Sequence, residues 1–202
     1  MTWGQRFARL ATALVVRLPL LWPALRGPLR GMFDRLASTW KTRIGPDHVS
    51  ALELAVARLE PPRRVLDLGT GTGVGATMLA RHFPEAEVVG VDLSPAMVVE
   101  SKRMLPPELA PRVRFEVGDA SALRVEDGAF DLVVLVNMIP FFDELARVTA
   151  PSAAVAISFS RGGETPIYVP FDRLRRELAR RGFSEFGEFA AGTATALLAK
   201  RG

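Results

Sequence analysis

From residue 47 onward, the chain alternates short apolar runs with segments in which apolar residues recur every three or four positions. The first pattern is typical of buried strands and the second of the helices that cover them. The runs predict strands at 64–68, 86–91, 113–117, 130–136, 153–159, 184–190 and 193–199, and the periodic segments predict helices at 49–59, 74–82, 95–104, 141–148 and 171–181. This order predicts an α/β fold with a doubly wound parallel sheet and helices on both faces.

Side chains suited to helix ends support these boundaries. Asp47 is placed to cap the first of these helices, and Ser94 followed by a proline is typical of a helix start. Gly182 is a typical stop for the last helix. Ala191 and Gly192 form a hairpin-like pair between the last two predicted strands.

The first 45 residues have a different pattern. Apolar residues at three- and four-residue spacing predict a helix over 3–18, interrupted by Pro19 and Pro23, and a second helical piece that runs to Trp40. This segment carries eight basic side chains against one acid, whereas the remaining residues carry 18 basic and 21 acidic groups. The net charge of +4 therefore belongs to residues 1–45, which we treat as a basic helical arm on a domain formed by residues 46–202.

Three roles for the arm stay open from sequence. It can cover the active site as a lid, pack on a second subunit in a homodimer, or lie on a membrane surface as a basic amphipathic helix near a lipophilic substrate. Arg17 divides its apolar run, which is shorter than the roughly 20 apolar residues of a membrane span. No clear small-residue cleavage site follows, so support for a signal peptide is weak.

Composition narrows the classes of function. The 202 residues, 49% of them hydrophobic, suffice for one domain with a small appendage. Without cysteine, the chain cannot form disulfides, zinc–thiolate sites or a cysteine nucleophile, which fits a cytoplasmic protein. The two histidines, His48 and His82, leave little for a metal site, so we expect no metal. The slightly acidic domain makes nucleic acid an unexpected partner.

A glycine-rich turn follows the first predicted strand. Residues 65–76 read Val-Leu-Asp-Leu-Gly-Thr-Gly-Thr-Gly-Val-Gly-Ala, which is an apolar run, a turn and a helix start. The glycines permit positive φ and close approach of a ligand, and the N–H groups of the first helical turn face that ligand. Asp67 would repel a pyrophosphate but suits an ammonium or sulfonium charge. The turn therefore favours S-adenosylmethionine over a dinucleotide.

Two further acids follow the next two predicted strands. Asp92 lies about 20 residues past the glycine turn, where a carboxylate can accept both hydroxyls of a ribose. Asp119 and the N–H of Ala120 can receive the exocyclic amine and a ring nitrogen of adenine. Because ligands of doubly wound sheets bind beyond the carboxyl ends of the strands, we expect these acids to lie at one site.

The chain resembles the class I S-adenosylmethionine-dependent methyltransferases in four segments that occur in the family's order and spacing. They are Val65–Gly73 in the turn, 89–95 around Asp92, 117–120 around Asp119, and 130–134. The subgroup that it resembles comprises quinone-biosynthesis-like and other small-molecule enzymes. The resemblance implies a seven-stranded sheet with an antiparallel last strand. Methyl transfer from a sulfonium is an in-line displacement, and we expect a small-molecule acceptor, with a lipophilic one as an option.

The resemblance also implies roles for single residues. Gly69, Gly71 and Gly73 would contact the methionine part of the cofactor, Asp92 the ribose, and Asp119 with Ala120 the adenine, with Leu93 against its face. The expected cofactor residues also include Asp67, Thr70 and Asn137. The sequence departs from the family at 150–153, where many relatives have Pro-Gly-Gly, and at 137–141, where the prolines of an Asn-Pro-Pro-aromatic motif are not adjacent.

Methyl transfer asks little of side chains beyond orienting the acceptor and excluding water, and a general base is needed only when the acceptor loses a proton. No residue is assigned as catalytic. His48 can reach the acceptor pocket or be exposed at a helix start. Asn137, Met138 and the polar loop at 161–168 are candidates for acceptor contacts. Asp131 begins its strand, at the end away from the site, and is expected to be structural. The arginines of 173–181 are expected to form a solvated helix face.

Two other classes of function stay open. Residues 71–76 also fit the relaxed G-x-G-x-x-A fingerprint of a nicotinamide-dinucleotide oxidoreductase, although Asp67, Asp119 and the absence of hydride-transfer partners disfavour it. A non-catalytic cofactor-binding protein with a membrane-surface arm is the third hypothesis.

Overall fold

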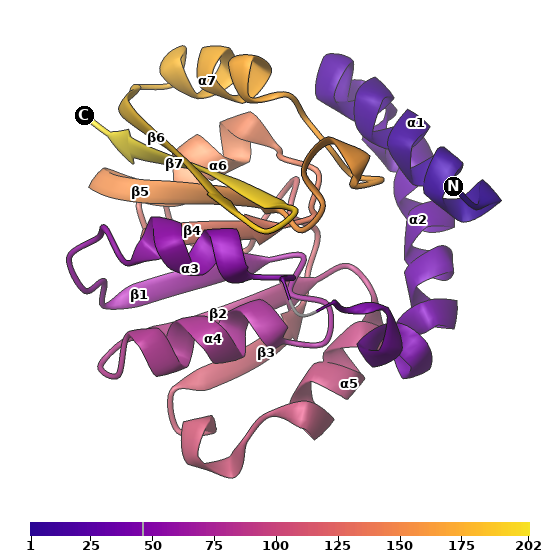
Figure 1. Cartoon of the computed structure of the whole chain (residues 1–202), viewed down its shortest axis with the longest axis horizontal. Coiled ribbons are helices and arrows are strands. Elements are labelled where there is room, and N and C mark those ends of the chain that lie inside the picture. The colour runs from indigo at the N-terminus through magenta and orange to yellow at the C-terminus, as the bar shows by residue number, and fades with distance from the viewer. Residues whose placement is uncertain (46) are drawn as a thin grey trace.

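The computed structural model describes residues 1–45 and 47–202, and a seven-stranded sheet forms its centre (Figure 1). The strands are β1 (Arg64–Leu68), β2 (Glu87–Asp92), β3 (Val113–Val117), β4 (Phe130–Val136), β5 (Thr149–Phe159), β6 (Phe183–Ala191) and β7 (Ala194–Arg201). They lie in the order β3-β2-β1-β4-β5-β7-β6. The first five are parallel, and β7 is antiparallel to both its neighbours. The predicted doubly wound fold is confirmed.

Helices cover the two faces of the sheet and bury separate hydrophobic cores. One core joins the sheet to α3 (Ser50–Val56), α4 (Val74–His82) and α5 (Pro95–Met104), and the other joins it to α6 (Phe142–Val148) and α7 (Phe171–Ala179). Because successive strand residues point to opposite faces, neighbours such as Val65 and Leu66 enter different cores. Three short 3₁₀ turns, η1 (Pro19–Leu21), η3 (Pro107–Leu109) and η4 (Gly162–Glu164), lie in connections.

Most predicted boundaries agree with the structure to within a few residues, and the cap at Asp47 is wrong. Helix α3 begins at Ser50, its N-cap is Val49, and no side chain caps it. The Asp47 carbonyl accepts from the Ser50 backbone N–H, and the Asp47 carboxylate lies against Gly192 in the turn between β6 and β7. Packing on this turn therefore replaces the local capping geometry. Ser94 does cap α5, accepting the N–H of Met97.

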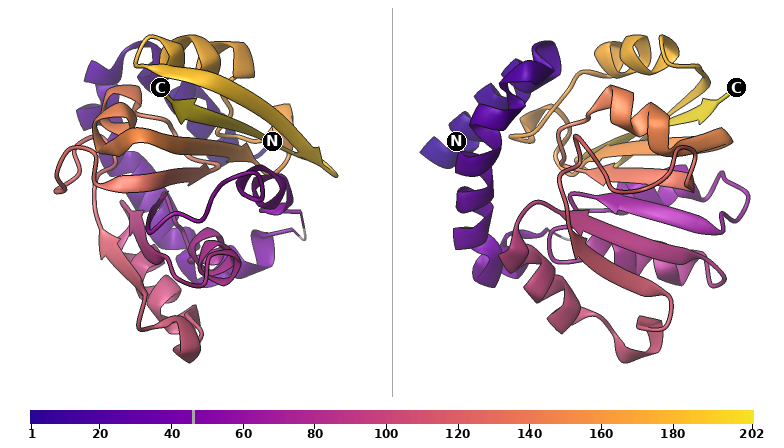
Figure 2. Two further views of the ribbon diagram at one scale, coloured as in Figure 1. Left: turned by 90° about the vertical axis from the view of Figure 1, so that its left-hand side faces the viewer. Right: turned by 180° about the vertical axis from the view of Figure 1, so that it is seen from behind.

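The arm crosses the edge of the sheet at which β1, β2 and β3 end (Figures 1 and 2). It consists of α1 (Trp3–Arg17), η1, α2 (Trp22–Leu36) and the 3₁₀ segment η2 (Ala37–Arg43). Its buried residues Ala8, Ala11, Val15 and Leu29 belong to the core beneath α6 and α7. No helix in the part of the chain that the structure describes is long and apolar enough to cross a bilayer.

Long-range hydrogen bonds attach the arm to the domain. The Arg9 guanidinium donates to the carbonyls of Gly163 and Thr165 at 2.7 and 2.9 Å. Arg173 of α7 donates to the carbonyl of Val16 at 2.9 Å. The expectation that the arginines of α7 form only a solvated face is therefore wrong for Arg173, because it reaches across to α1. Asp131 is structural as expected, since its carboxylate accepts the backbone N–H groups of residues 63 and 64.

Candidate functional site

A cavity of about 730 Å³ lies between the arm and the strand ends. This is within the size range of small-molecule sites. The domain contributes eight of the expected cofactor residues to its lining: Asp67, Gly69, Thr70, Gly71, Asp92, Leu93, Ala120 and Asn137. The arm contributes apolar residues opposite them, among them Leu29, Met32, Phe33 and Trp40. The sheet edge and the arm therefore enclose one site, to which segments more than 100 residues apart in the chain contribute.

The glycine turn follows β1 and forms one wall of the cavity. Gly69 and Gly71 have φ of 70° and 55°, a backbone conformation that favours glycine. A Cβ at Gly69 would lie 2.9 Å from the sulfur of Met138, and one at Gly71 would lie 3.4 Å from the indole nitrogen of Trp40. Met138 and Trp40 thus lie close to the backbone of the turn, and a side chain at Gly69 would collide with Met138.

Gly73, the third glycine expected at the cofactor, lies outside the described lining of the cavity. It is the N-cap of α4, with φ of 83°, and a Cβ there would lie 2.7 Å from the Phe115 ring. A Cβ at Gly90 of β2 would come within 2.5 Å of the same ring. Because Gly73 and Gly90 have no side chains, Phe115 can pack beneath the turn. Gly73 therefore has a role in packing.

Asp67 is buried at the end of β1 and faces the cavity. Its Oδ2 accepts the Thr70 hydroxyl at 2.7 Å, and its carboxylate also accepts the backbone N–H of Ala76 in the first turn of α4. A Cβ on Gly75 would lie 2.9 Å from this carboxylate, so the helix can approach only with glycine there. Burial raises the pKa of Asp67 to about 6, against the opposing effect of these hydrogen bonds.

Asp92 ties the glycine turn to the start of α5. Its Oδ2 accepts the N–H of Gly71 at 2.9 Å, and its Oδ1 accepts the N–H of Ser94 at 2.8 Å. Burial raises the pKa of Asp92, and the nearby carboxylate of Asp34 on α2 adds to this increase. The backbone N–H of Leu93 is a further donor, so three backbone groups hold this carboxylate at the end of β2.

Asp119 is held by the arm. The indole N–H of Trp22 donates to both its oxygens at 2.8 and 3.0 Å, and Arg26 donates to Oδ2 at 3.2 Å. Ser121 donates to Oδ1 through its backbone N–H and its hydroxyl. Burial alone would raise the pKa of Asp119, but these hydrogen bonds outweigh it and lower the pKa. Among the described lining residues are Gly118, Ala120 and Trp22, but not Asp119.

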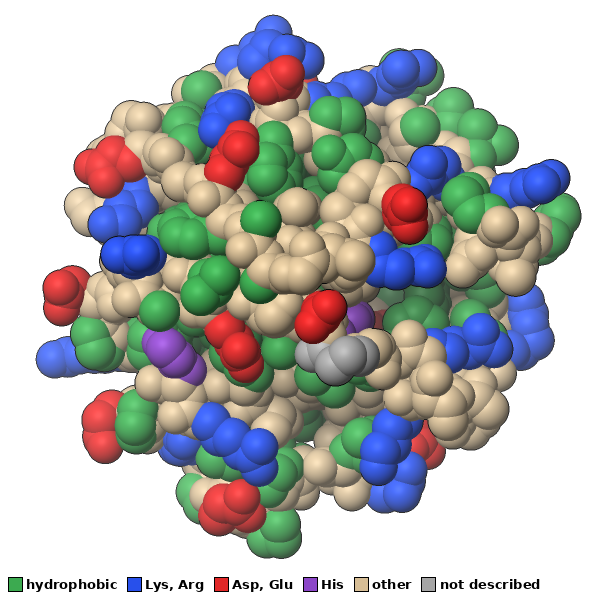
Figure 3. Space-filling model, viewed as in Figure 1, with side chains coloured by type: hydrophobic (Ala, Val, Ile, Leu, Met, Phe, Trp, Pro, Cys, Tyr) green, Lys and Arg blue, Asp and Glu red, His purple; other side chains and the backbone are tan. Residues whose placement is uncertain are grey.

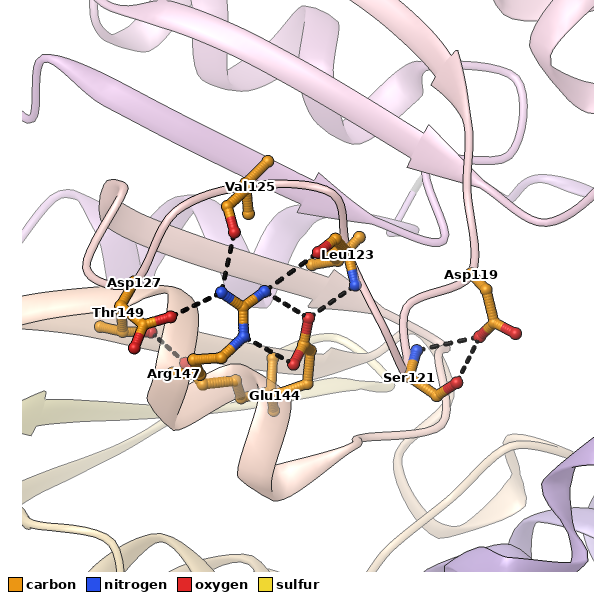
Figure 4. Close-up of polar contacts among 9 residues, drawn as sticks. Asp119, Ser121, Leu123, Val125, Asp127, Glu144, Arg147 and Thr149 are labelled. Atoms are coloured by element: carbon orange, nitrogen blue, oxygen red, sulfur yellow. Dashed lines mark hydrogen bonds and ion pairs between the residues drawn. The ribbon is translucent and has the colours of Figure 1, made fainter.

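The loop that carries Asp119 is anchored by Arg147 of α6 (Figure 4). Arg147 donates to the carbonyls of Leu123 and Val125 and forms ion pairs with Asp127 and Glu144. Glu144 in turn accepts the N–H of Leu123 at 2.6 Å. These bonds satisfy the backbone of a loop without regular structure and so fix the end of β3 relative to β4 and β5.

The far part of the cavity is formed by the ends of β4 and β5 and by His48. Asn137 has φ of 53° and exchanges two hydrogen bonds with Ser160, at 2.8 and 2.9 Å. Met138 and Ile139 continue this wall, and Thr165, Pro166 and Ile167 of the expected acceptor loop also line the cavity. His48 lies in the same lining, and burial lowers its pKa, so its imidazole is neutral at neutral pH.

Sequence reasoning missed the contacts of the arm with the predicted acids. Trp22 and Arg26 bind Asp119, and Asp34 accepts the hydroxyl of Ser94 beside Asp92. The signal that could have found them is weak: Asp34 is the one acid of a basic segment, and Trp22 lies between Pro19 and Pro23, where the amphipathic pattern is interrupted.

Comparisons with known proteins agree with this geometry. Residues 65–156 match a family described as a methyltransferase domain. The chain is 41% identical over 143 residues to a malonyl-[acyl-carrier protein] O-methyltransferase of Halorhodospira halophila. The aligned region covers 63% of this chain and 46% of that protein. It is 40% identical over 114 residues to a demethylmenaquinone methyltransferase of Thermus thermophilus, covering 53% and 50%. The chain thus spans about half the length of these curated relatives.

A solved structure shows the same fold. A SAM dependent methyltransferase from Aquifex aeolicus superimposes with a TM-score of 0.65 at 18% identity, over 82% of this chain and 98% of that chain. The superimposed region, which includes the sheet, is longer than residues 65–156, the segment that matches the family.

Proposed function

The chain belongs to the class I S-adenosylmethionine-dependent methyltransferases, and we propose that it transfers a methyl group from this cofactor to a small, apolar acceptor. The observation that carries the proposal is the convergence of Asp67, Asp92 and the glycine turn on one cavity that the arm encloses. The acceptor is inferred from the cavity, because the two relatives are named for different acceptors.

The polar groups of the cavity fit this cofactor. Asp67 would hold the ammonium group, the turn from Gly69 to Gly71 the methionine backbone, and Asp92 the ribose hydroxyls. Thr72 lies in the lining with a buried hydroxyl that has no hydrogen-bond partner among the described residues. Such a group is costly unless a ligand satisfies it, and a carboxylate or amine of the methionine part would do so.

When bound, S-adenosylmethionine supplies an electrophilic methyl group on a sulfonium centre. The chain contributes an enclosed site that orients an acceptor and excludes water, the effects on which an in-line displacement depends. Asn137, held by Ser160, presents a polar edge at the acceptor side, and Met138 presents an apolar one. The neutral imidazole of His48 can accept a proton if the acceptor loses one.

The apolar acceptor follows from the wall that faces the strand ends. Leu29, Met32 and Phe33 of α2 lie opposite Met138 and Ile139 of the domain in the same lining. Burying an apolar group against these side chains is favourable by roughly 25 cal/mol per Å² of surface removed from water. An acceptor with a hydrophobic body therefore fits this space better than a sugar or a nucleotide.

The test of the cofactor site is calorimetric titration with S-adenosylhomocysteine. We expect the wild type to bind it and Asp92→Ala to bind at least about tenfold more weakly, because two hydroxyl acceptors are lost. Asp172→Ala, which removes a carboxylate that is 84% exposed on α7, is the matched control and should bind as the wild type does. NADH should not bind. Wild-type protein without measurable affinity for S-adenosylhomocysteine would contradict the proposal.

We also propose that the outer face of the arm rests on an anionic membrane surface. Among the described residues, six of the nine exposed large apolar side chains lie within the first 21 positions: Met1, Trp3, Leu10, Leu18, Leu20 and Leu21. Exposed Arg6 and Arg17 lie among them, and Figure 3 shows hydrophobic and basic side chains together along the arm's margin, at the right of the view. Apolar residues beside cations are typical of helices that bind anionic lipid.

Flotation with lipid vesicles tests this surface. The protein should float with vesicles containing phosphatidylserine, less with neutral phosphatidylcholine vesicles, and less at high salt. Leu20→Glu, at a side chain that is 92% exposed, should abolish flotation, whereas Val99→Glu on α5 should not. A dimer in light scattering that Leu20→Glu dissociates, without vesicle binding, would instead assign this face to a second copy of the chain.

A further inference from the structure

The carboxylate of Asp119 has no hydrogen-bonding capacity left for a ligand. A carboxylate offers about four lone-pair sites. In the structure it accepts the Trp22 indole N–H, the Arg26 guanidinium, and the N–H and hydroxyl of Ser121. The indole N–H is shared between both oxygens. An adenine amine can therefore reach this carboxylate only if a donor from the arm leaves.

Trp22 also stands where a ligand would approach. The lining of the cavity includes Gly118 and Ala120 on either side of Asp119 and the side chain of Trp22 itself. Trp22 is 6% exposed and packs in one core with Ala120 and Phe141. The rings of Trp22 and Phe141 are in an edge-to-face arrangement with 4.9 Å between their centroids. A planar aromatic ring with an N–H donor thus occupies the position that the proposed adenine site requires for its own planar ring and amine.

We propose that Trp22 is a cofactor-site residue that competes with adenine for Asp119. This inference rests on the proposed function, in which Asp119 recognises the adenine amine. When the arm covers the site as in the structure, Trp22 and Arg26 donate to Asp119 in place of the adenine amine. Cofactor binding displaces the indole from the carboxylate, so that occupancy of the adenine site and the position of α2 are coupled.

The coupling has a direct consequence for affinity. When only a fraction of the molecules has Asp119 free, the apparent dissociation constant for the cofactor rises by the inverse of that fraction. Removing the competing donor should therefore tighten binding, although the substitution deletes a hydrogen bond from the native structure. A residue that merely supported the fold would have the opposite effect or none.

The experiment compares Trp22→Phe with Trp3→Phe in calorimetric titrations of the full chain. Phenylalanine keeps an aromatic ring in the core but removes the donor, and Trp3 is 79% exposed on the outer face of the same arm. Trp22→Phe should bind S-adenosylhomocysteine about tenfold more tightly than the wild type, the value of one hydrogen bond to a charged group. Trp3→Phe should bind as the wild type does.

A second ligand ties the effect to the adenine amine. The analogue of S-adenosylhomocysteine that has unsubstituted purine in place of adenine carries hydrogen at C6, so it cannot donate to Asp119 and should gain nothing from Trp22→Phe. Unchanged or weaker binding of S-adenosylhomocysteine by a folded Trp22→Phe protein would overturn the inference. Failure of the wild type to bind S-adenosylhomocysteine at all would instead contradict the proposed function.

Two further measurements keep the inference testable if Trp22→Phe does not fold, as judged by circular dichroism. Arg26→Met removes the other donor of the arm from a side chain that is 54% exposed, and it should tighten binding about threefold. In addition, saturating S-adenosylhomocysteine should shift the emission of a Trp3→Phe/Trp40→Phe protein, in which Trp22 is the remaining tryptophan, to longer wavelength, because Trp22 leaves its buried position. No tightening in Arg26→Met and no emission shift would together reject the competition.

Discussion

Three carboxylates at neighbouring strand ends have different electrostatic surroundings, although each follows a strand in the same way. Burial raises the pKa of Asp67 to about 6 and also raises the pKa of Asp92. The pKa of Asp119 is lowered, because hydrogen bonds from Ser121, Trp22 and Arg26 outweigh burial. A cationic ligand group beside Asp67 would relieve the cost of ionising it there. The buried acid is thus suited to bind an ammonium group rather than to be charged alone.

The pH dependence of cofactor binding should reveal this carboxylate. An ammonium group binds the ionised form of Asp67, which predominates above about pH 6. The affinity for S-adenosylhomocysteine should therefore be full above this pH and fall as pH decreases through it, by up to about tenfold per unit. Asp67→Asn should bind weakly with a flatter pH profile. His48→Gln, in the same lining, should keep the wild-type slope.

This prediction fails if calorimetry between pH 5 and 8 gives the same slope for the wild type and Asp67→Asn. The direction in which the affinity changes with pH is decisive, because a group that bound the ligand in its protonated form would give higher affinity at low pH.

At the scale of elements, the loop between β3 and β4 depends on α6 for its shape. Arg147 is the common partner of the Leu123 and Val125 carbonyls and of two carboxylates, and its side chain is 30% exposed. The helix that follows β4 thereby positions the loop that precedes β4. Asp119 lies at the start of that loop, so its placement relative to the cavity depends on a side chain 28 positions later.

Replacing Arg147 should therefore affect both stability and ligand binding. Arg147→Met keeps an apolar stem but leaves the two carbonyls and Glu144 without their donor, which should lower the free energy of unfolding by about 2–3 kcal/mol. The affinity for S-adenosylhomocysteine should fall several-fold, because the loop that carries Asp119 is less ordered. Arg124→Met, at an exposed position in the same loop, is the control for urea denaturation and calorimetry. Equal effects of both substitutions would contradict the anchoring role.

At the scale of the whole molecule, the arm completes the site. The strand ends supply carboxylates and bare backbone, whereas α2 supplies the apolar wall and the donors on Asp119. Hydrogen bonds from Arg9 to Gly163 and Thr165 attach the start of the arm to the loop after β5. We infer that residues 1–45 act as a lid, because closing the cavity requires them.

Loosening this attachment should be visible by hydrogen exchange. Arg9→Met removes two bonds that join segments more than 150 residues apart, so the amides of α1 should exchange faster while those of β1 and β4 keep their protection. Arg6→Met, at an exposed position one turn earlier, should leave the exchange of α1 unchanged. Unaltered α1 protection in Arg9→Met would show that apolar packing alone holds the arm.

The sequence by itself determined the strands, most helix ends and the strand-end acids. These features depend on local rules: strand and helix periodicity, a serine cap before proline, and glycines where φ must be positive. Four segments in family order were enough to predict the sheet topology and the class of cofactor. The cap at Asp47 failed because packing against Gly192 of a distant turn competes with local capping.

Only the tertiary structure decided which of these residues share a cavity and what covers it. Trp22 meets Asp119 across 97 positions and Asp34 meets Ser94 across 60, and no periodicity encodes such pairs. Gly73 and Gly71 look alike in the turn, yet Gly73 makes room for Phe115 while Gly71 lines the cavity. The physical reason is that local sequence specifies backbone conformation and burial, whereas contacts between distant side chains depend on how whole elements pack.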